Sequence, residues 1–267
     1  MLAKMVVKGE SLLDEPMEFT CFRAPTDNDG ILGRGVAVQW KGHGNFGNIE
    51  YPELSVTDMK AQKEENCVKL EGEFLFAVQG RCIISRGKIT YRVWGDGRLE
   101  ISQESILSEK LPYWLPRYGY LLKLKPGAAA PEYFGYGPGE CYEDKCSHAL
   151  LGRYTYICDD TYGAYEKPQE SGSHCGTKWL KVNSGNTNLH IWGESFSFCA
   201  SRFDLHKMTQ AKHRYQLQPE ETLQLYLDYR MSGVGSNSIG GQPPLEQCRL
   251  NPGERIRFTL SLCPMQS

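Results

Sequence analysis

The sequence contains no long apolar run and no excess of charge of either sign. None of its apolar stretches approaches the roughly 20 residues that a membrane-spanning helix requires. The 30 Lys and Arg residues nearly balance the 32 Asp and Glu residues, which leaves a formal net charge of −2. A chain without a basic excess has no overall field that would draw it to phosphate backbones or anionic lipid. We therefore expect neither a nucleic acid nor a membrane as a partner.

Paired cysteine motifs are also missing, although the chain contains 10 cysteines. There is no Cys-x-x-Cys pair and no Cys/His spacing of the zinc-binding type. Charged residues such as Lys4 and Glu10 interrupt the first 20 positions, so no signal-peptide core is present there. We expect a cytoplasmic protein with reduced thiols that pack as small apolar groups, and no metal or cofactor held by this chain.

Helical periodicity is scarce, and alternation with a period of two is common. Only residues 36–41 and 204–212 could form short helices, and neither has the apolar repeats of a helical layer. Apolar residues alternate with polar ones over 89–94, 223–228 and 256–262, as in half-buried antiparallel strands. Further strands are expected over 54–60, 68–76, 81–84, 99–106, 119–124, 178–182, 189–192 and 196–201. The pattern predicts one all-β antiparallel sandwich domain over residues 1–267.

The first residues of the chain have the sequence pattern of a strand without the signals that usually precede one. Residues 1–7 are predicted as a strand, yet no turn or capping signal precedes them. We expect the domain to lack its first strands, either because the chain is a piece of a larger polypeptide or because it is a natural small subunit.

The first polar motif covers residues 22–30, with the sequence FRAPTDNDG. Asp27, Asn28 and Asp29 can bond nearby backbone amides, and Arg23 can hold a carboxylate with two parallel hydrogen bonds. Such a turn is a structural element by default. The functional alternative is that it holds the following loop, formed by Gly30, Ile31, Leu32, Gly33 and Arg34, which opens and closes over a ligand.

A second motif, YFGYGPGECY, covers residues 133–142. No amphipathic helix follows it, so it does not fit a phosphate-binding loop. We interpret its glycines as positions where strands approach each other closely at the sandwich edge. Its aromatic residues could line a sugar groove, but packing in the core or between domains is the favoured interpretation.

Several motifs in order resemble the C-terminal domain of the glycoside hydrolase family 2 β-galactosidases. They are RAPTDND at 23–29, YFGYGPGECY at 133–142, GRY at 152–154, YEKPQESG at 165–172, WL at 179–180 and GVGSNS at 233–238. The resemblance covers residues 1 to about 264. It implies a supersandwich similar to that of galactose mutarotases, which forms the fifth and last domain behind a catalytic barrel.

The resemblance also implies where the chemistry lies. Retaining glycosidases need two carboxylates about 5 Å apart, and in this family both are glutamates of the barrel. This chain is therefore expected to contain no catalytic residue and to be inactive alone. Its implied partners are the remaining domains or a large subunit, a galactoside substrate such as lactose, and further copies in a homo-oligomer. Magnesium and sodium belong to other domains of the intact family.

Two segments are implied to bind substrate in the intact enzyme. The loop from Gly30 to Arg34 would close over the sugar, and Asn237, Ser238 and Ile239 would lie beside the aglycone. Ile239 falls at the position of an aromatic residue in the best-known members, so stacking there is lost. Two alternatives stay open: a stand-alone aldose 1-epimerase, which would need a His and a Glu converging in one pocket, and a non-catalytic carbohydrate-binding module.

Overall fold

The fold is built almost entirely from antiparallel strands. The computed structural model describes residues 1–7, 9–30, 35–40, 48–156, 165–184, 187–235 and 243–265. The strands are β1 Val6–Val7, β2 Glu10–Ser11, β3 Glu18–Thr20, β4 Glu53–Lys63, β5 Cys67–Val78, β6 Cys82–Trp94, β7 Leu99–Leu107, β8 Arg117–Leu124, β9 Ala129–Gly137, β10 Leu150–Thr155, β11 His174–Ser184, β12 Thr187–Ser201, β13 Leu223–Met231 and β14 Arg255–Met265. The helices are α1 Ala37–Trp40 and α2 Leu205–Gln210, with 3-10 turns η1 Asp27–Asp29, η3 Arg214–Gln216 and η4 Glu246–Cys248.

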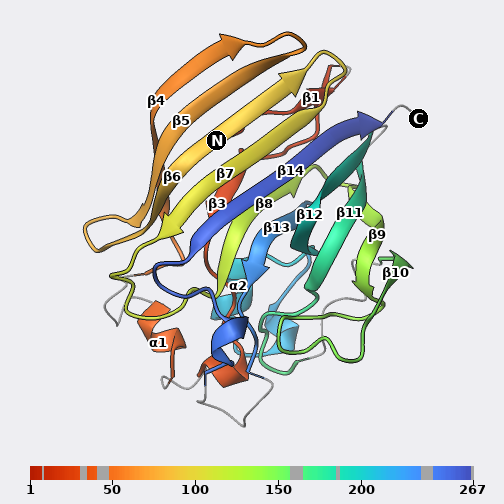
Figure 1. The fold of residues 1–267 in the computed structure, drawn as a ribbon. Helices are drawn as coiled ribbons and strands as arrows, with labels where there is room; N and C mark the ends of the chain where they lie inside the picture. Colours follow the sequence, from red (N-terminus) through yellow and green to blue (C-terminus); the bar gives the residue numbers. More distant parts are fainter. Residues whose placement is uncertain are drawn as a thin grey trace.

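Two layers share one long strand. The main sheet has the order β10-β9-β11-β12-β14-β7-β6-β5-β4, and its long strands run side by side across the upper part of Figure 1. The first half of β12 pairs with β14, whereas its second half, Ser197 to Ser201, pairs with β13. Strand β13 also pairs with β8, and β8 pairs with β3; these strands form the second layer. This arrangement confirms the predicted all-β antiparallel sandwich.

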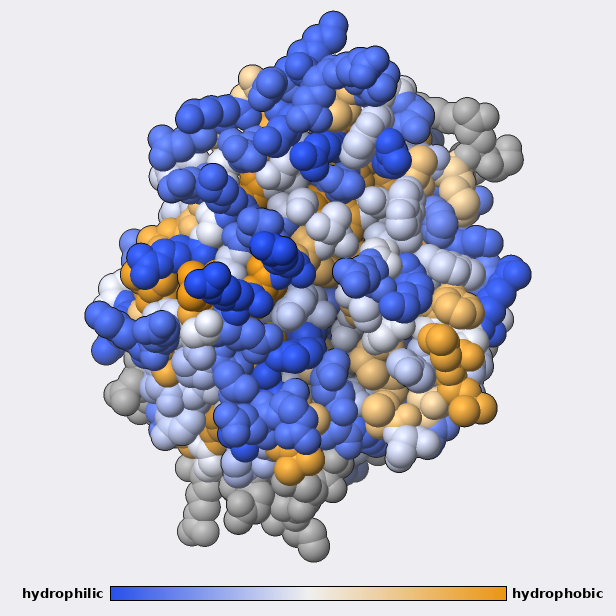
Figure 2. Space-filling model, in the orientation of Figure 1, coloured by the Kyte–Doolittle hydropathy of each residue, from blue (hydrophilic) through white to orange (hydrophobic). Residues whose placement is uncertain are grey.

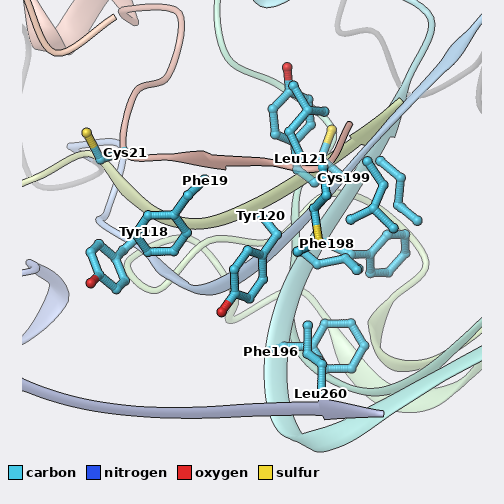
Figure 3. Close-up of a cluster of buried hydrophobic side chains, with 14 of the residues drawn as sticks. Phe19, Cys21, Tyr118, Tyr120, Leu121, Phe196, Phe198, Cys199 and Leu260 are labelled. Carbon is cyan, nitrogen blue, oxygen red and sulfur yellow. The ribbon is translucent and has the colours of Figure 1, made fainter. Parts of the chain in front are cut away.

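The core lies between the two layers and is rich in aromatic side chains. The ring of Phe19 on β3 meets Phe76 of β5 edge-on, with centroids 4.5 Å apart. Tyr120 of β8 stacks on Phe258 of β14 at 5.8 Å. Figure 3 shows side chains of β3, β8, β12 and β14 in this core. Aromatic pairs at such distances add stabilisation beyond the burial of apolar area.

Most predicted strands are confirmed, with several corrections. The separate strands expected over 81–84 and 89–94 form one continuous strand, β6, and those expected over 189–192 and 196–201 form β12. The short strand β2 was not predicted. Strands β9 and β10 were not predicted, because glycine and proline weaken the strand signal of their sequences. Strand β3 was not predicted either, and the strand expected over residues 1–7 is limited to Val6–Val7. Residues 2 and 5 instead bond back to residues 17 and 12.

Strand β13 is also more buried than its alternation predicts. The polar residues Gln224, Tyr226 and Asp228 are all buried, as are the leucines between them. They bond within a polar layer: Tyr226 donates to Gln224 Oε1 at 3.1 Å, and Asp228 faces Arg117 of β8 at 3.1 Å. The polar face of β13 is thus a buried layer that holds a hydrogen bond and an ion pair, rather than a solvated surface.

The interpretation of the glycines of the second motif is confirmed for Gly135, whereas a Cβ atom at Gly139 would have no neighbour closer than 4.0 Å. Gly135 of β9 lies so close to β11 that a Cβ atom there would be 3.0 Å from the Cα of Thr177. Tyr133 and Tyr142, from the same motif, are buried in packing contacts.

The surface is mainly hydrophilic over the long strands of the main sheet (Figure 2). Apolar patches appear at the lower right of the same face, and the edge strand β10 exposes Leu150 and Leu151. None of the helices in the described ranges is long and apolar enough to cross a membrane. The nine cysteines in those ranges are free thiols, as predicted.

Candidate functional site

The FRAPTDNDG motif folds into the 3-10 turn η1, which is closed by its own side chains. Thr26 caps the turn: its Oγ1 accepts from the amide of Asp29 at 3.2 Å, and its backbone N–H donates to Asp29 Oδ2 at 2.9 Å. Gly30 ends the turn with a φ of 97°, a left-handed conformation that glycine adopts readily. The backbone therefore leaves the turn in a fixed direction at Gly30, which is the first residue of the expected loop.

Arg23 is the centre of this turn and is completely buried. Its Nε and Nη2 atoms donate to the two carboxylate oxygens of Asp29 at 3.0 and 2.8 Å, which is the bidentate pair that the sequence suggests. Its guanidinium also donates to the backbone oxygens of Ser232 and Gly233, at 2.5 and 2.9 Å. The turn and the last glycine-rich segment, about 210 positions apart in the chain, thus share one arginine.

Two further side chains hold the glycine-rich segment. Asn28 donates from Nδ2 to the backbone oxygens of Val234 and Gly235, at 2.9 and 3.1 Å. From the other side, Asp144 accepts from the amides of the same two residues, both at 2.8 Å. The segment is fixed through its carbonyl groups by one loop and through its amide groups by another.

Asp27 is held separately, by Gln169 of the YEKPQESG motif. The Asp27 amide donates to Gln169 Oε1 at 2.9 Å, and Gln169 Nε2 donates to Asp27 Oδ2 at 3.2 Å. Gln169 is therefore an internal hydrogen-bonding residue, which links its motif to the turn. Three of the motifs that carry the family resemblance therefore meet at one end of the sandwich.

A cavity of about 450 Å3 lies where these motifs meet. Its lining residues come from the turn, from the region of α1, from the segment before β8 and from the last loops; they are Asn28, Asp29, Gly35, Val36, Gln39, Tyr113, Trp114, Gly235, Pro243, Pro244 and Arg249. In Figure 1 the red turn over 27–29 and the blue turn over 246–248 lie together at the lower end of the molecule. We call this the loop cavity.

The residues with predicted substrate contacts lie at the borders of the described structure. Ile31, Leu32, Gly33 and Arg34, and likewise Asn237, Ser238 and Ile239, are outside the described residues. The positions that flank both segments line the loop cavity: Asp29 and Gly35 on one side, Gly235 and Pro243 on the other. The described residues that flank the two segments are therefore brought together at one cavity.

Acidic residues close together in a turn usually form a solvated face, but Glu140 and Asp144 of the cluster Glu140, Glu143 and Asp144 have internal partners. Glu140 instead accepts from the amide of Gly172 at 2.7 Å and pairs with Lys145, while Asp144 holds the glycine-rich segment. Contacts of Asp144 with residues 90 positions later leave no local pattern in the sequence, so sequence reasoning missed this residue.

A buried cluster of three charged side chains contacts the turn. Arg117 lies between Asp228, at 3.1 Å, and Glu170, at 3.5 Å, and all three side chains are at most 5% exposed. Burial raises the pKa of Asp228 to about 7, and Arg117 opposes that rise. Burial also raises the pKa of Glu170, against the opposing effects of Arg117 and Arg23. The backbone amide of Glu170 donates to the Ala24 oxygen, which links this group to the turn.

The chain also contains a His and a Glu that meet in a cavity, as the epimerase alternative requires. His206 Nδ1 lies 2.9 Å from Glu50 Oε1, in a second cavity between β3, β8 and β13. An acid and a base that act on a ring must reach it from opposite sides, whereas these two groups bond directly to each other. The pair therefore lacks the arrangement that epimerase chemistry needs. Among the described residues, no three His, Cys, Asp or Glu side chains are grouped so as to hold a metal ion.

Comparison with solved structures shows the fold. Galactose 1-epimerase from Lactobacillus acidophilus NCFM aligns over 99% of this chain and 88% of its own, with a TM-score of 0.51 and 10% sequence identity. This similarity confirms the predicted galactose mutarotase-like fold.

Comparison with curated sequences and family models identifies the relatives. The β-galactosidase of Actinobacillus pleuropneumoniae is 36% identical over 94% of this chain, and that of Staphylococcus xylosus is 30% identical over 90%. The chain spans about a quarter of the length of these relatives, 24% and 23%. The family model described as "Beta galactosidase small chain" matches residues 1–262. With residues 1–262 matched by this model, the chain belongs to the β-galactosidase small-chain family.

Proposed function

We propose that the chain is the C-terminal domain of a β-galactosidase that hydrolyses terminal β-galactosides such as lactose, and that the loop cavity forms the aglycone side of its active site. The catalytic part would be supplied by the rest of a longer polypeptide or by a large subunit. The observation that carries this proposal is the contact between the turn and the glycine-rich segment at the loop cavity, through Arg23 and Asn28.

The loop cavity is suited to binding rather than to glycoside cleavage. Asp29 is the acidic residue among its described lining residues, and both of its carboxylate oxygens accept hydrogen bonds from Arg23. A retaining mechanism needs one free carboxylate as nucleophile and another as acid and base. The aromatic rings of Tyr113 and Trp114 give this cavity apolar faces that suit sugar rings.

A domain exchange tests the proposal. The matching quarter of the Actinobacillus pleuropneumoniae enzyme is replaced by residues 1–262 of this chain, and hydrolysis of an aryl β-galactoside is measured. We expect the chimera to be active, whereas the chain alone and the relative without the matching quarter should be inactive. Turnover by the purified chain alone, above that of a mock preparation from the same host, would contradict the proposal.

A variant of the chimera separates a substrate-binding role from a purely structural one. Asn28→Ala removes the hydrogen bonds to Val234 and Gly235 and should raise the KM for lactose several-fold. The exposed Gln218, which bonds only locally to Tyr215, provides the control Gln218→Ala. An unchanged KM in Asn28→Ala would show that the loop cavity has no role in substrate binding. Cytoplasmic location, assembly into a homo-oligomer and independence of this chain from cofactors stay predictions.

A further inference from the structure

A second cavity of about 450 Å3 lies apart from the loop cavity and shares no lining residue with it. It opens between β3, β8, β13, the start of α2 and the segment that leads into β4. Its polar lining includes Glu18, Glu50, Tyr51, Asp204, His206 and Gln224. We call it the β3 cavity.

Three side chains of the β3 cavity form one unit. Tyr51 stacks on His206, with ring centroids 4.7 Å apart and an interplanar angle of 11°. His206 Nδ1 lies 2.9 Å from Glu50 Oε1. The Glu50 side chain is only 5% exposed, whereas Tyr51 is 55% exposed. The exposed ring of Tyr51 therefore lies beside the buried carboxylate of Glu50, and His206 contacts both side chains.

The carboxylate retains capacity to accept hydrogen bonds. His206 and Tyr51 both contact Glu50 at Oε1, at 2.9 and 3.5 Å. A carboxylate can accept about four hydrogen bonds, and Glu50 lines the cavity, so it can also accept from the hydroxyls of a ligand. Gln224 and Tyr226 lie farther inside, bonded to each other at 3.1 Å, and add amide and hydroxyl groups to the floor.

The charge of the β3 cavity restricts its ligands. Four carboxylates, from Glu18, Glu50, Glu53 and Asp204, line it, against Lys123 and His206. Lys123 is already paired with Glu18 at 3.2 Å and with Glu15. Anionic ligands such as phosphate esters or carboxylic acids would therefore be repelled.

The aromatic content favours a neutral ligand over a cation. Sites that hold organic cations surround them with several aromatic faces. In the β3 cavity Tyr51 is exposed, whereas Phe19 and Tyr226 are 7% and 4% exposed. One open ring with carboxylate and amide groups beside it suits a sugar, because the C–H face of the sugar packs on the ring while its hydroxyls donate to the acceptors.

We propose that the β3 cavity is a second carbohydrate-binding site, which holds one neutral monosaccharide ring against Tyr51 with its hydroxyls directed to Glu50. This site lies outside the aglycone side assigned above and does not depend on that assignment. No bond is made or broken in it, because His206 and Glu50 bond to each other and do not flank a ring.

The chain contains a matched control for this arrangement. Tyr215 stacks on His213 at 5.4 Å and 7°, and His213 Nδ1 lies 3.2 Å from Glu166 Oε1. The Glu166 side chain is 84% exposed and Tyr215 is 74% exposed, so this copy of the same three residue types stands on the open surface. Its carboxylate is solvated and gains little from a sugar hydroxyl.

The experiment titrates the purified full chain with galactose, glucose and methyl β-galactoside, and follows binding by calorimetry and by the imidazole signals in NMR spectra. We expect binding by the wild type, with the His206 signals shifted and the His213 signals unchanged. Tyr51→Ala and Glu50→Gln should each weaken binding about fivefold to tenfold, because each removes one of the two main contacts. Tyr215→Ala and Glu166→Gln should bind as the wild type does.

Several outcomes would overturn the proposal. One is that the wild type binds no sugar. Others are that Tyr215→Ala weakens sugar binding as much as Tyr51→Ala does, or that only Asn28→Ala weakens it. The last is that choline chloride shifts the His206 signals and none of the sugars does. The NMR measurement on the wild type needs no variant, so a folding failure of Tyr51→Ala would not leave the question open. Because binding to the chain alone is measured, failure here is distinct from failure of the domain exchange.

Discussion

Asp144 accepts a hydrogen bond from the backbone amide of Gly235 at 2.8 Å, across 91 positions of the chain. The other carboxylate oxygen accepts from Val234 at the same distance. These two bonds lie on the opposite side of the segment from Asn28, so the segment is held between two loops. Asp144 therefore fixes the last two described residues before the segment of the expected aglycone contacts.

The first prediction concerns Asp144→Asn. The amide keeps one acceptor and presents an NH2 group to a backbone N–H, so one charge-assisted hydrogen bond is lost. Such bonds contribute about 1.5 to 3 kcal/mol, and we expect the free energy of unfolding to fall by that amount in urea titrations. The neighbouring substitution Glu143→Gln is the control and should have a smaller effect. In the active chimera, Asp144→Asn should also raise the KM for lactose, and a normal KM would limit Asp144 to a structural role.

The second prediction concerns Arg23→Lys. The lysine keeps the charge but loses the bidentate pair with Asp29 and cannot reach both backbone oxygens of residues 232 and 233. Breaking a buried ion pair costs about 3 to 5 kcal/mol when one partner is removed, so we expect a loss of about 2 to 4 kcal/mol here. Urea titration measures it. Arg257, whose side chain is 87% exposed, provides the control, because Arg257→Lys should leave stability unchanged.

The fold was largely predictable because antiparallel strands leave a local signal. Alternation over 256–262 matches the alternate burial of the first part of β14. The signal is lost where burial is two-sided. In β13 both faces are covered, so Gln224 and Asp228 mark a buried polar layer that looks like a solvated face in the sequence.

The site was predictable only where its contacts are local. The pairing of Arg23 with Asp29, six positions apart, could be read from the turn motif. The contacts of Asp144 with Val234 and of Asn28 with Gly235 depend on which loops the sheet brings together, and no spacing in the sequence reports them. The contact of His206 with Glu50 is of the same kind, because 156 positions separate these two residues.

The third prediction is that two histidines titrate in opposite directions. Burial lowers the pKa of His174 to about 4, whereas the hydrogen bond to Glu50 raises the pKa of His206 above its usual value, with burial opposing and Asp204 assisting that rise. NMR titration of the imidazole signals measures both. Protonation of His174 near pH 6.5 or loss of the His206 proton below that pH would contradict the prediction.

The raised pKa of His206 also fixes a stability change with pH. The folded state holds this proton more tightly than the unfolded chain does, so the stabilisation is fully present below about pH 6.5 and is lost as the pH rises through the folded pKa. For His174 the sign is reversed, because the folded state binds its proton less tightly; stability from this group rises between about pH 4 and 6.5. His206→Gln should remove the loss above pH 6.5, which urea titrations at several pH values would show. His213→Gln, at the exposed copy, is the control.

The last prediction concerns Ile239, which lies outside the described residues. Its segment is flanked by Gly235 and Pro243, and both of these line the loop cavity together with Asn28 and Trp114. Position 239 falls between these two flanking residues in the sequence. The family resemblance implies an aromatic residue there, and Ile239→Trp would supply a ring on which a sugar can stack, with a gain of about 1 kcal/mol.

In the active chimera, this gain should appear as tighter inhibition by glucose, by about fivefold, because each 1.4 kcal/mol corresponds to a factor of ten. Inhibition by galactose should change much less, since galactose is held by the catalytic part. Ile239→Leu, which changes the shape without adding a ring, is the control and should leave both inhibition constants unchanged. The β3 cavity is lined by other residues, so the substitution should not alter sugar binding to the chain at Tyr51. If glucose inhibition is equal in the wild type and in Ile239→Trp, the loop does not present position 239 to the aglycone, and its assignment to substrate binding is wrong.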